Sequence, residues 1–113
     1  MSILDLQYTD WDREVDSSNT PVVVEFWHQS CPLCKKIEST VIELPAKLGE
    51  RAKLVRLNVL DSRENRRFAI DKGVVGTPTF KIYCRGVEVG EIVGLETTEN
   101  LLGAVENLLK NCA

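Results

Sequence analysis

Two cysteines stand three residues apart in the segment WHQSCPLCKK, residues 27–36. The pair Cys31 and Cys34 fits half of a metal site, a structural disulfide, or a redox centre that alternates between dithiol and disulfide. A structural zinc site needs about four ligands. The chain offers one histidine, no second pair with this spacing, and two isolated cysteines, Cys84 and Cys112. We therefore predict no metal and no other cofactor, and the redox interpretation is favoured.

Composition predicts one globular domain spanning residues 1–113. Hydrophobic residues make up 43% of the chain and charged residues 27%, which is typical of a soluble domain. The net charge of -3, from 17 acidic and 14 basic residues, disfavours a nucleic-acid partner, which would favour a basic surface.

The expected location is the cytoplasm, without a membrane partner. No apolar stretch is long enough to cross a bilayer, and the N-terminus lacks the charged and apolar regions of a signal peptide. Because cytosolic thiols stay reduced, a purely structural disulfide between Cys31 and Cys34 is disfavoured.

The cysteine pair lies between a predicted strand and a predicted helix. Residues 21–27, PVVVEFW, form a short β-branched run of the kind shown by strands buried on both faces. From Pro32, a residue favoured at the first position of a helix, apolar residues follow helical spacing as far as Leu48. Gly49 offers a stop, and Pro45 is expected to bend the helix or end it.

Strands and helices alternate along the rest of the chain. A turn at Arg85-Gly86 joins the last two strands as a hairpin. The order β-α-β-α-β-α-β-β-α predicts an α/β fold, a mixed sheet with helices on both faces in a three-layer sandwich. The remaining elements are predicted as strands at 4–8, 53–60, 77–84 and 87–94, a short helix at 10–17, a helix capped by Asp61 or Ser62 that runs through Lys72, and a last helix capped by Thr97 or Thr98.

This placement gives the two cysteines different chemistry. A thiol at the start of a helix faces unpaired backbone N–H groups and the positive end of the helix dipole. Both favour the thiolate, which is the attacking species in disulfide exchange. We therefore predict that Cys31 is a nucleophile. Cys34, one turn inside the helix, can reach the Cys31 sulfur and close an intramolecular disulfide.

The chain resembles the thioredoxin family along nearly its whole length. The segments that carry the resemblance are VVVEFW, CPLCKKIE, VRLNV, VGTPTF and GVEVGEIVG, followed by the last helix, in the order and spacing of that family. The resemblance implies the thioredoxin fold and a protein disulfide reductase, in which Cys31 attacks and Cys34 resolves. The implied partners are disulfide-containing protein substrates and a thioredoxin-reductase-type electron donor, and the implied oligomeric state is a monomer.

The resemblance also implies a substrate-binding surface. Pro78 matches the cis-proline that packs against the disulfide in the family. Thr77, the residue before it, matches the position whose backbone pairs with an extended substrate. The other residues expected to bind substrate are Gly76, Gly94, Pro32, Leu33 and Trp27.

One acidic residue, Glu25, interrupts the apolar strand ahead of the cysteines. A buried carboxylate is costly unless it is paired or protonated, and burial would raise its pKa. Glu25 matches a proton acceptor beneath Cys34 that is usually aspartate in the family, and Arg56 matches the basic residue that pairs with it. The alternative is an exposed strand glutamate.

Departures from the family pattern leave the direction of the reaction open. The usual W-C-G-P-C is S-C-P-L-C here, which resembles glutaredoxins and periplasmic disulfide oxidants. Two alternatives to a reductase therefore stay open: a glutaredoxin-like thioltransferase or more oxidising exchange protein, and an interaction or regulatory module without turnover. We interpret His28 as a partly exposed residue that could add charge near the thiolate. The remaining residues, Trp11, Cys84 and Cys112, are interpreted as core residues.

Overall fold

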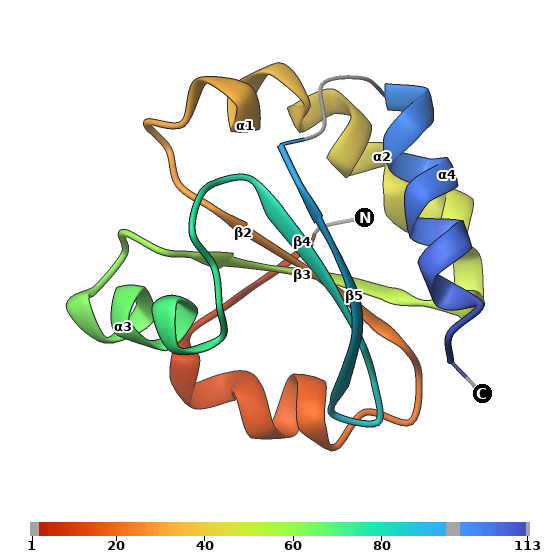
Figure 1. Cartoon of the computed structure of the whole chain (residues 1–113), viewed down its shortest axis with the longest axis horizontal. Coiled ribbons are helices and arrows are strands. Elements are labelled where there is room, and N and C mark those ends of the chain that lie inside the picture. Colours follow the sequence, from red (N-terminus) through yellow and green to blue (C-terminus); the bar gives the residue numbers. More distant parts are fainter. Residues whose placement is uncertain (1–2, 95–97, 113) are drawn as a thin grey trace.

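The computed structural model describes residues 3–94 and 98–112, and five strands within them form one sheet (Figure 1). The strands are β1 (Leu4–Leu6), β2 (Val22–Trp27), β3 (Lys53–Asn58), β4 (Thr79–Cys84) and β5 (Val87–Val93). The helices are α1 (Pro32–Lys36), α2 (Glu38–Leu48), α3 (Arg63–Asp71) and α4 (Thr98–Leu109). Short 3-10 or π segments cover Tyr8–Asp10, Asp12–Asp16 and Gly49–Arg51.

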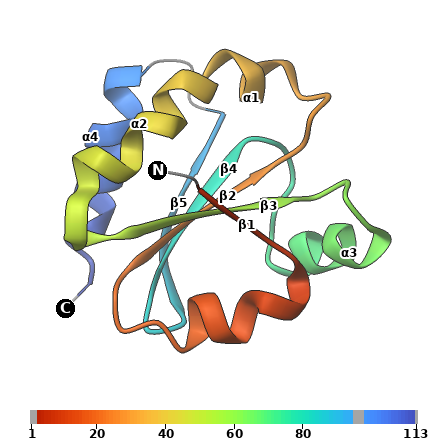
Figure 2. The same ribbon diagram turned by 180° about the vertical axis from the view of Figure 1, so that it is seen from behind.

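The sheet is mixed, as the sequence predicted. Its strand order is β1-β3-β2-β4-β5. Strands β1, β3 and β2 run parallel to one another, whereas β4 pairs with β2 and β5 in antiparallel fashion. The edges of the sheet are therefore β1 and β5 (Figure 2).

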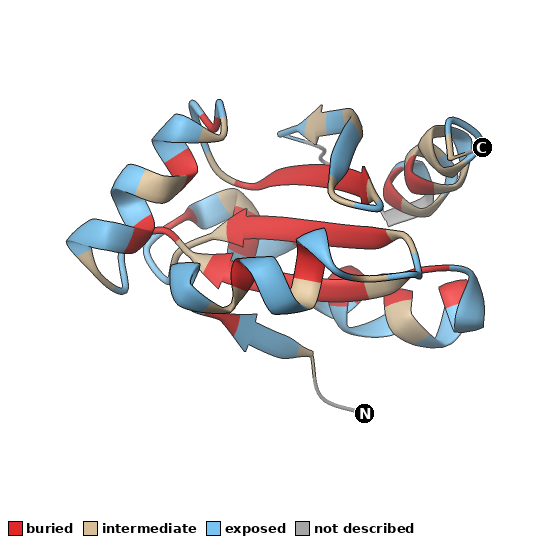
Figure 3. Ribbon diagram, turned by 90° about the horizontal axis from the view of Figure 1, so that it is seen from below, coloured by how far each residue is buried: buried red, intermediate tan, exposed pale blue. Residues whose placement is uncertain are grey.

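Helices cover both faces of the sheet, which confirms the predicted three-layer sandwich. The core divides into two clusters of buried side chains. One cluster joins the sheet to Trp11, Val15 and α3, and the other joins it to α1, α2 and α4. Figure 3 shows the buried strands between helices whose outer faces are exposed. The predicted burial of Trp11 is confirmed, since 3% of its surface is exposed.

The central strand β2 positions the cysteine pair. Residues 22 to 26 of β2 are all buried, because β3 and β4 flank this strand and helices cover both of its faces. The antiparallel register pairs Phe26 with Thr79. The end of β2 and the start of β4 therefore meet at one edge of the sheet, where the turn to α1 and the loop before β4 lie together.

Several local predictions are confirmed. The hairpin turn has positive φ at both Arg85 (52°) and Gly86 (82°), the geometry that matches the twist of the flanking strands. The cap of α3 is Ser62, whose hydroxyl accepts the Asn65 N–H at 2.9 Å. The predicted cap Thr97 lies outside the described residues. None of the helices in the described part of the chain is long and apolar enough to cross a bilayer.

Three local predictions about helices need correction. The single helix expected from Pro32 to Leu48 is divided at Ile37, whose φ and ψ of -99° and 5° are not helical. Hydrogen bonds from Ile37 N–H to Leu33 and from Val41 N–H to Ile37 cross this point, so the break is a kink. Pro45, which was expected to bend the helix or end it, does not end it but lies inside α2. The short helix expected over 10–17 is 3-10 and π rather than α.

Candidate active site

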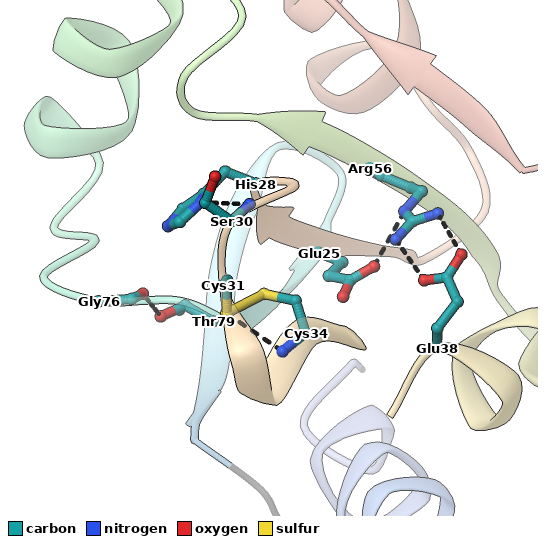
Figure 4. Close-up of a disulfide and its surroundings, with 9 residues drawn as sticks. All are labelled: Glu25, His28, Ser30, Cys31, Cys34, Glu38, Arg56, Gly76 and Thr79. Carbon is teal, nitrogen blue, oxygen red and sulfur yellow. Dashed lines mark hydrogen bonds and ion pairs between the residues drawn. A yellow bond between two sulfur atoms is a disulfide. The ribbon is translucent and has the colours of Figure 1, made fainter. Parts of the chain in front are cut away.

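Cys31 and Cys34 form a disulfide at the start of α1 (Figure 4). Cys31 caps the helix in an extended conformation, and its sulfur accepts the backbone N–H of Cys34 at 3.1 Å. Pro32 occupies the first helical position, where its missing N–H removes no hydrogen bond. A hydrogen bond from a backbone N–H favours the charged form of its acceptor. The local geometry thus stabilises a thiolate on Cys31 once the disulfide is reduced.

The loop before β4 faces this turn. The Thr77–Pro78 peptide bond is cis, and Pro78 is buried while Thr77 is half-buried. The Pro78 carbonyl accepts the Gly94 N–H at 3.1 Å. Gly94 has a φ of 66°, and a Cβ there would lie 4.0 Å from the Leu33 side chain. Leu33 lies between the two cysteines, so these contacts bring the loop before β4 and the end of β5 to the disulfide.

The structure brings most of the predicted substrate-binding residues to this surface. Pro32 is exposed, and Leu33 and Trp27 are half-buried. The Gly76 carbonyl accepts the Thr79 hydroxyl at 2.6 Å (Figure 4). An apolar groove lies between His28, the loop before β4 and α3; its lining includes Thr77, Gly76, His28, Leu60, Ile70 and Val75.

Glu25 lies under the pair on β2 with none of its surface exposed, so its predicted burial is confirmed. Its Oε1 accepts the Arg56 Nε–H at 3.0 Å, while its Oε2 is buried and has no hydrogen-bond partner in the described part of the chain. Burial raises the pKa of Glu25 to about 7; Arg56 opposes this rise, and the Glu38 carboxylate adds to it. Figure 4 shows the Glu25 side chain between the disulfide and Arg56.

Sequence reasoning missed Glu38, the first residue of α2. Its two carboxylate oxygens accept hydrogen bonds from the Arg56 Nη groups, at 2.7 and 3.2 Å. Arg56, whose side chain is 10% exposed, also lies over the Trp27 ring at 4.2 Å from the centroid. The Arg56 charge is therefore shared between an outer carboxylate and the buried Glu25. The sequence alone does not indicate that Glu38 shares Arg56 with Glu25, because Glu38 resembles any other polar residue of a helix.

A cavity of about 320 Å³ opens beside Cys34 and Glu38. It is lined by Cys34 and Glu38 together with Trp27, His28, Gln29 and Lys35. The His28 Nδ1 accepts the Ser30 N–H at 3.2 Å, which fixes the ring at the mouth of the turn. Water in this cavity would contact both Cys34 and the Glu38 carboxylate.

Comparisons with known proteins agree with this geometry. The sequence model of the thioredoxin family matches residues 2–107. The chain belongs to the thioredoxin family. It is 32% identical to a protein named Thioredoxin from Griffithsia pacifica, over 98% of this chain and 99% of that one. It is 31% identical to one from Acetoanaerobium sticklandii, over 85% and 89%, and 29% identical to one from Rickettsia typhi, over 80% and 83%.

Within this thioredoxin-family fold, one prediction about the other cysteines is wrong. Cys84 and Cys112 were expected to be separate core residues, but they form a second disulfide with Cα atoms 5.7 Å apart. The β4 strand ends at Cys84 and the chain after α4 returns to that same point, which brings the two thiols together. No cysteine in the described part of the chain is free.

Glu38 gives a testable prediction in this family member. Glu38→Gln removes the like charge beside Glu25 and leaves more of the Arg56 charge to stabilise the Glu25 carboxylate. The titration midpoint of Glu25 in the oxidised protein should therefore move to lower pH. Carbon NMR of the Glu25 carboxyl group measures this midpoint directly.

The matched control for this prediction is Glu43→Gln. Glu43 lies on the same helix but pairs only loosely with Lys47, at 3.7 Å, and its side chain is 60% exposed. This variant loses the same charge from α2 without touching Arg56, so it should leave the Glu25 midpoint in place. An unchanged or higher Glu25 midpoint in Glu38→Gln would show that the Glu38 carboxylate does not help to raise the pKa of Glu25.

Proposed function

We propose that this protein is a protein disulfide reductase, a thiol-disulfide oxidoreductase whose Cys31 and Cys34 alternate between dithiol and disulfide. The observation that carries the proposal is the placement of Cys31 at the cap of α1, with its sulfur accepting the Cys34 N–H. The membership of the chain in the thioredoxin family supports it.

The first step is attack on a substrate disulfide. The Cys31 thiolate forms a bond to one substrate sulfur, and the substrate disulfide breaks with its electron pair on the other sulfur. The product is a mixed disulfide between Cys31 and the substrate, plus a substrate thiolate that takes a proton from water. The helix start and the Cys34 N–H stabilise the attacking thiolate.

The second step releases the substrate. Cys34 loses its proton, attacks the Cys31 sulfur and closes the Cys31–Cys34 disulfide, and the second substrate sulfur leaves as a thiolate. Glu25 is the proposed proton acceptor, because its pKa of about 7 lets it hold or release a proton near neutral pH. Its buried Oε2, without a hydrogen-bond partner among the described residues, is the atom proposed to take that proton.

Substrates are proposed to be extended segments of disulfide-containing proteins. Thr77 and Pro78, in the loop before β4, would support the substrate segment beside the disulfide. The other proposed substrate-binding residues are Pro32, Leu33, Gly76 and Gly94 around the segment, and Trp27 under the turn. Exposed apolar side chains continue this surface, with exposed fractions of 47% for Leu60, 56% for Ile70 and 92% for Val75. The proposed setting is a cytoplasmic monomer that a thioredoxin-reductase-type donor returns to the dithiol form.

The direct test is reduction of an insulin disulfide with dithiothreitol as the electron source. The protein is expected to speed the reaction well above the rate with dithiothreitol alone, because Cys31 is a better placed nucleophile than a free thiol. Precipitation of the reduced insulin chain gives the rate. A rate equal to that of dithiothreitol alone would favour an interaction module without turnover.

The direction of exchange follows from the potential of the same cysteine pair. Equilibration in glutathione buffers, followed by alkylation of free thiols, measures it. A value near about -270 mV supports the reductase, whereas a value near about -120 mV would indicate an oxidant instead.

A further inference from the structure

The Cys84–Cys112 disulfide lies at the opposite end of the sheet from the proposed active site. Strand β4 begins at Thr79, next to the cis Thr77–Pro78 bond, and ends at Cys84. At about 3.3 Å per residue this places Cys84 roughly 17 Å from the start of the strand. In Figure 1, α1 lies at the top of the view and the β4–β5 hairpin at the bottom. The two disulfides are therefore too far apart to exchange within one molecule.

We propose that Cys84 and Cys112 form a second redox centre, independent of Cys31–Cys34, whose oxidation fastens helix α4 to the sheet. The pair joins residues 28 positions apart, and the segment between them contains the hairpin turn, β5 and α4. Its Cα separation of 5.7 Å lies within the range that disulfides span without backbone movement.

The C-terminal segment is held to the same place by other contacts, so the thiols meet in a preformed site. The Asn111 side-chain amide donates to the Val89 carbonyl at 3.1 Å. Gly90 on β5 lacks the Cβ that would collide with Leu108 of α4, which lets the helix approach closely. The Cys112 N–H donates to Leu109 at 3.0 Å, which continues the helix turn to the cysteine.

The second pair is open to small thiols and disulfides. Cys84 and Cys112 are both half-buried. Cys112 lines an open groove with Arg51, Lys110, Glu106 and Pro21 among its neighbours. A low-molecular-weight disulfide such as glutathione disulfide can therefore reach the Cys112 sulfur from this groove, in which Arg51 is paired with Glu106 at 2.9 Å.

Oxidation of the pair balances as two exchange steps. The Cys112 thiolate attacks glutathione disulfide, which forms a mixed disulfide and releases one glutathione. The Cys84 thiolate then attacks the Cys112 sulfur, closes the protein disulfide and releases the second glutathione. The two electrons reduce glutathione disulfide, and the two thiol protons end on the two glutathione molecules.

Closing this loop should raise the stability of the whole fold. A cross-link removes conformational freedom from the unfolded chain, and it does so more strongly for longer loops. The oxidised second pair should therefore raise Tm by on the order of 10 °C relative to its dithiol form. Turnover at the distant Cys31 should stay unchanged.

The experiment isolates the second pair in a Cys31→Ser, Cys34→Ser protein. After equilibration in glutathione buffers and alkylation, both remaining thiols should disappear together as the buffer becomes more oxidising. Trypsin cleaves after Lys81, Arg85 and Lys110, so non-reducing mass spectrometry should find peptide 82–85 joined to peptide 111–113. Thermal unfolding of the oxidised and reduced protein then gives the shift in Tm.

Adding Cys112→Ser to the same protein supplies the matched control. The Tm of this triple variant should equal that of the reduced Cys31→Ser, Cys34→Ser protein and should not change when oxidant is added. Cys84→Ser in the same protein should give the same result. Cys112→Ser alone, with Cys31 and Cys34 intact, should reduce insulin as fast as the wild type at 25 °C. The proposal fails if the two peptides carry separate glutathione adducts, if they are joined only between molecules, or if oxidation leaves Tm unchanged.

Discussion

Cys34→Ser is expected to trap protein substrates covalently, whereas Cys31→Ser is expected to trap none and to lose catalysis of disulfide reduction. In Cys34→Ser, the Cys31 thiolate still attacks, but no second thiol resolves the mixed disulfide. In Cys31→Ser, the attacking sulfur itself is gone. Non-reducing electrophoresis of each purified variant after incubation with a disulfide-bonded protein shows the adduct, and dithiothreitol should release it.

The distinction between the two thiols rests on hydrogen bonding rather than on exposure. Their exposed fractions are 4% for Cys31 and 2% for Cys34, a difference too small to separate their reactivities. The Cys31 sulfur, however, accepts the Cys34 N–H at the helix start, and Cys34 lies closer to the acidic Glu25 side of the turn (Figure 4). The reduced Cys31 should therefore react with iodoacetamide at lower pH than Cys34.

The second disulfide supplies the control for trapping. Cys112→Ser leaves both active-site cysteines in place, so it should form no stable adduct and should turn over normally. Faster alkylation of Cys34 than of Cys31 would reverse the assigned roles. An adduct that mass spectrometry places on Cys84 or Cys112 would mean that trapping does not report the active site.

The features that sequence could predict are those encoded within a few neighbouring residues. The β-branched run of 22–24 and the proline after Cys31 are enough to place the cysteine pair between a strand and a helix. A carboxylate inside that apolar run raised the expectation that Glu25 is buried. The alternation of strands and helices then predicted the mixed sheet with covered faces, which the structure confirms.

The features that sequence could not predict depend on contacts between distant segments. Glu38 contacts Arg56 only because α2 packs over β3, and nothing in the segment between these residues, which are 18 positions apart, encodes that pairing. Cys84 and Cys112 likewise look like two unrelated apolar positions until the chain after α4 returns to the end of β4. The sequence held only a weak signal for this disulfide. Cys84 precedes the hairpin turn and Cys112 follows the last helix, and these two elements must pack together.

Glu25→Gln is expected to remove a pH-dependent loss of stability from the folded protein. Below pH 4.5 the Glu25 carboxyl is protonated in both states, so its burial costs little. Between about pH 4.5 and 7 the unfolded chain ionises this group while the folded chain retains the proton, because burial raises its pKa to about 7. The free energy of unfolding therefore falls as pH rises through this window, by about 3 kcal/mol in total.

Glutamine is the appropriate replacement because of Arg56. Its amide oxygen can still accept the Arg56 Nε–H that Glu25 accepts at 3.0 Å. Alanine would remove that acceptor and leave a buried guanidinium with Glu38 alone on that side, which itself destabilises. The charged groups around Glu25 that stay in place are Arg56 on β3, Glu38 on α2 and Asp5 on β1.

Urea unfolding of wild type and Glu25→Gln at a series of pH values from about 4 to 8 measures the difference directly. The variant should match the wild type at the acid end and become progressively more stable above it, with the gain levelling off past pH 7. It should also resolve the mixed disulfide more slowly, because the proposed acceptor for the Cys34 proton is gone.

Glu50→Gln, which replaces an exposed carboxylate, controls for the loss of one charge and should show no such trend. A stability difference that is flat across the series, or that grows toward acid pH, would mean that Glu25 does not titrate in the neutral range and does not hold the Cys34 proton.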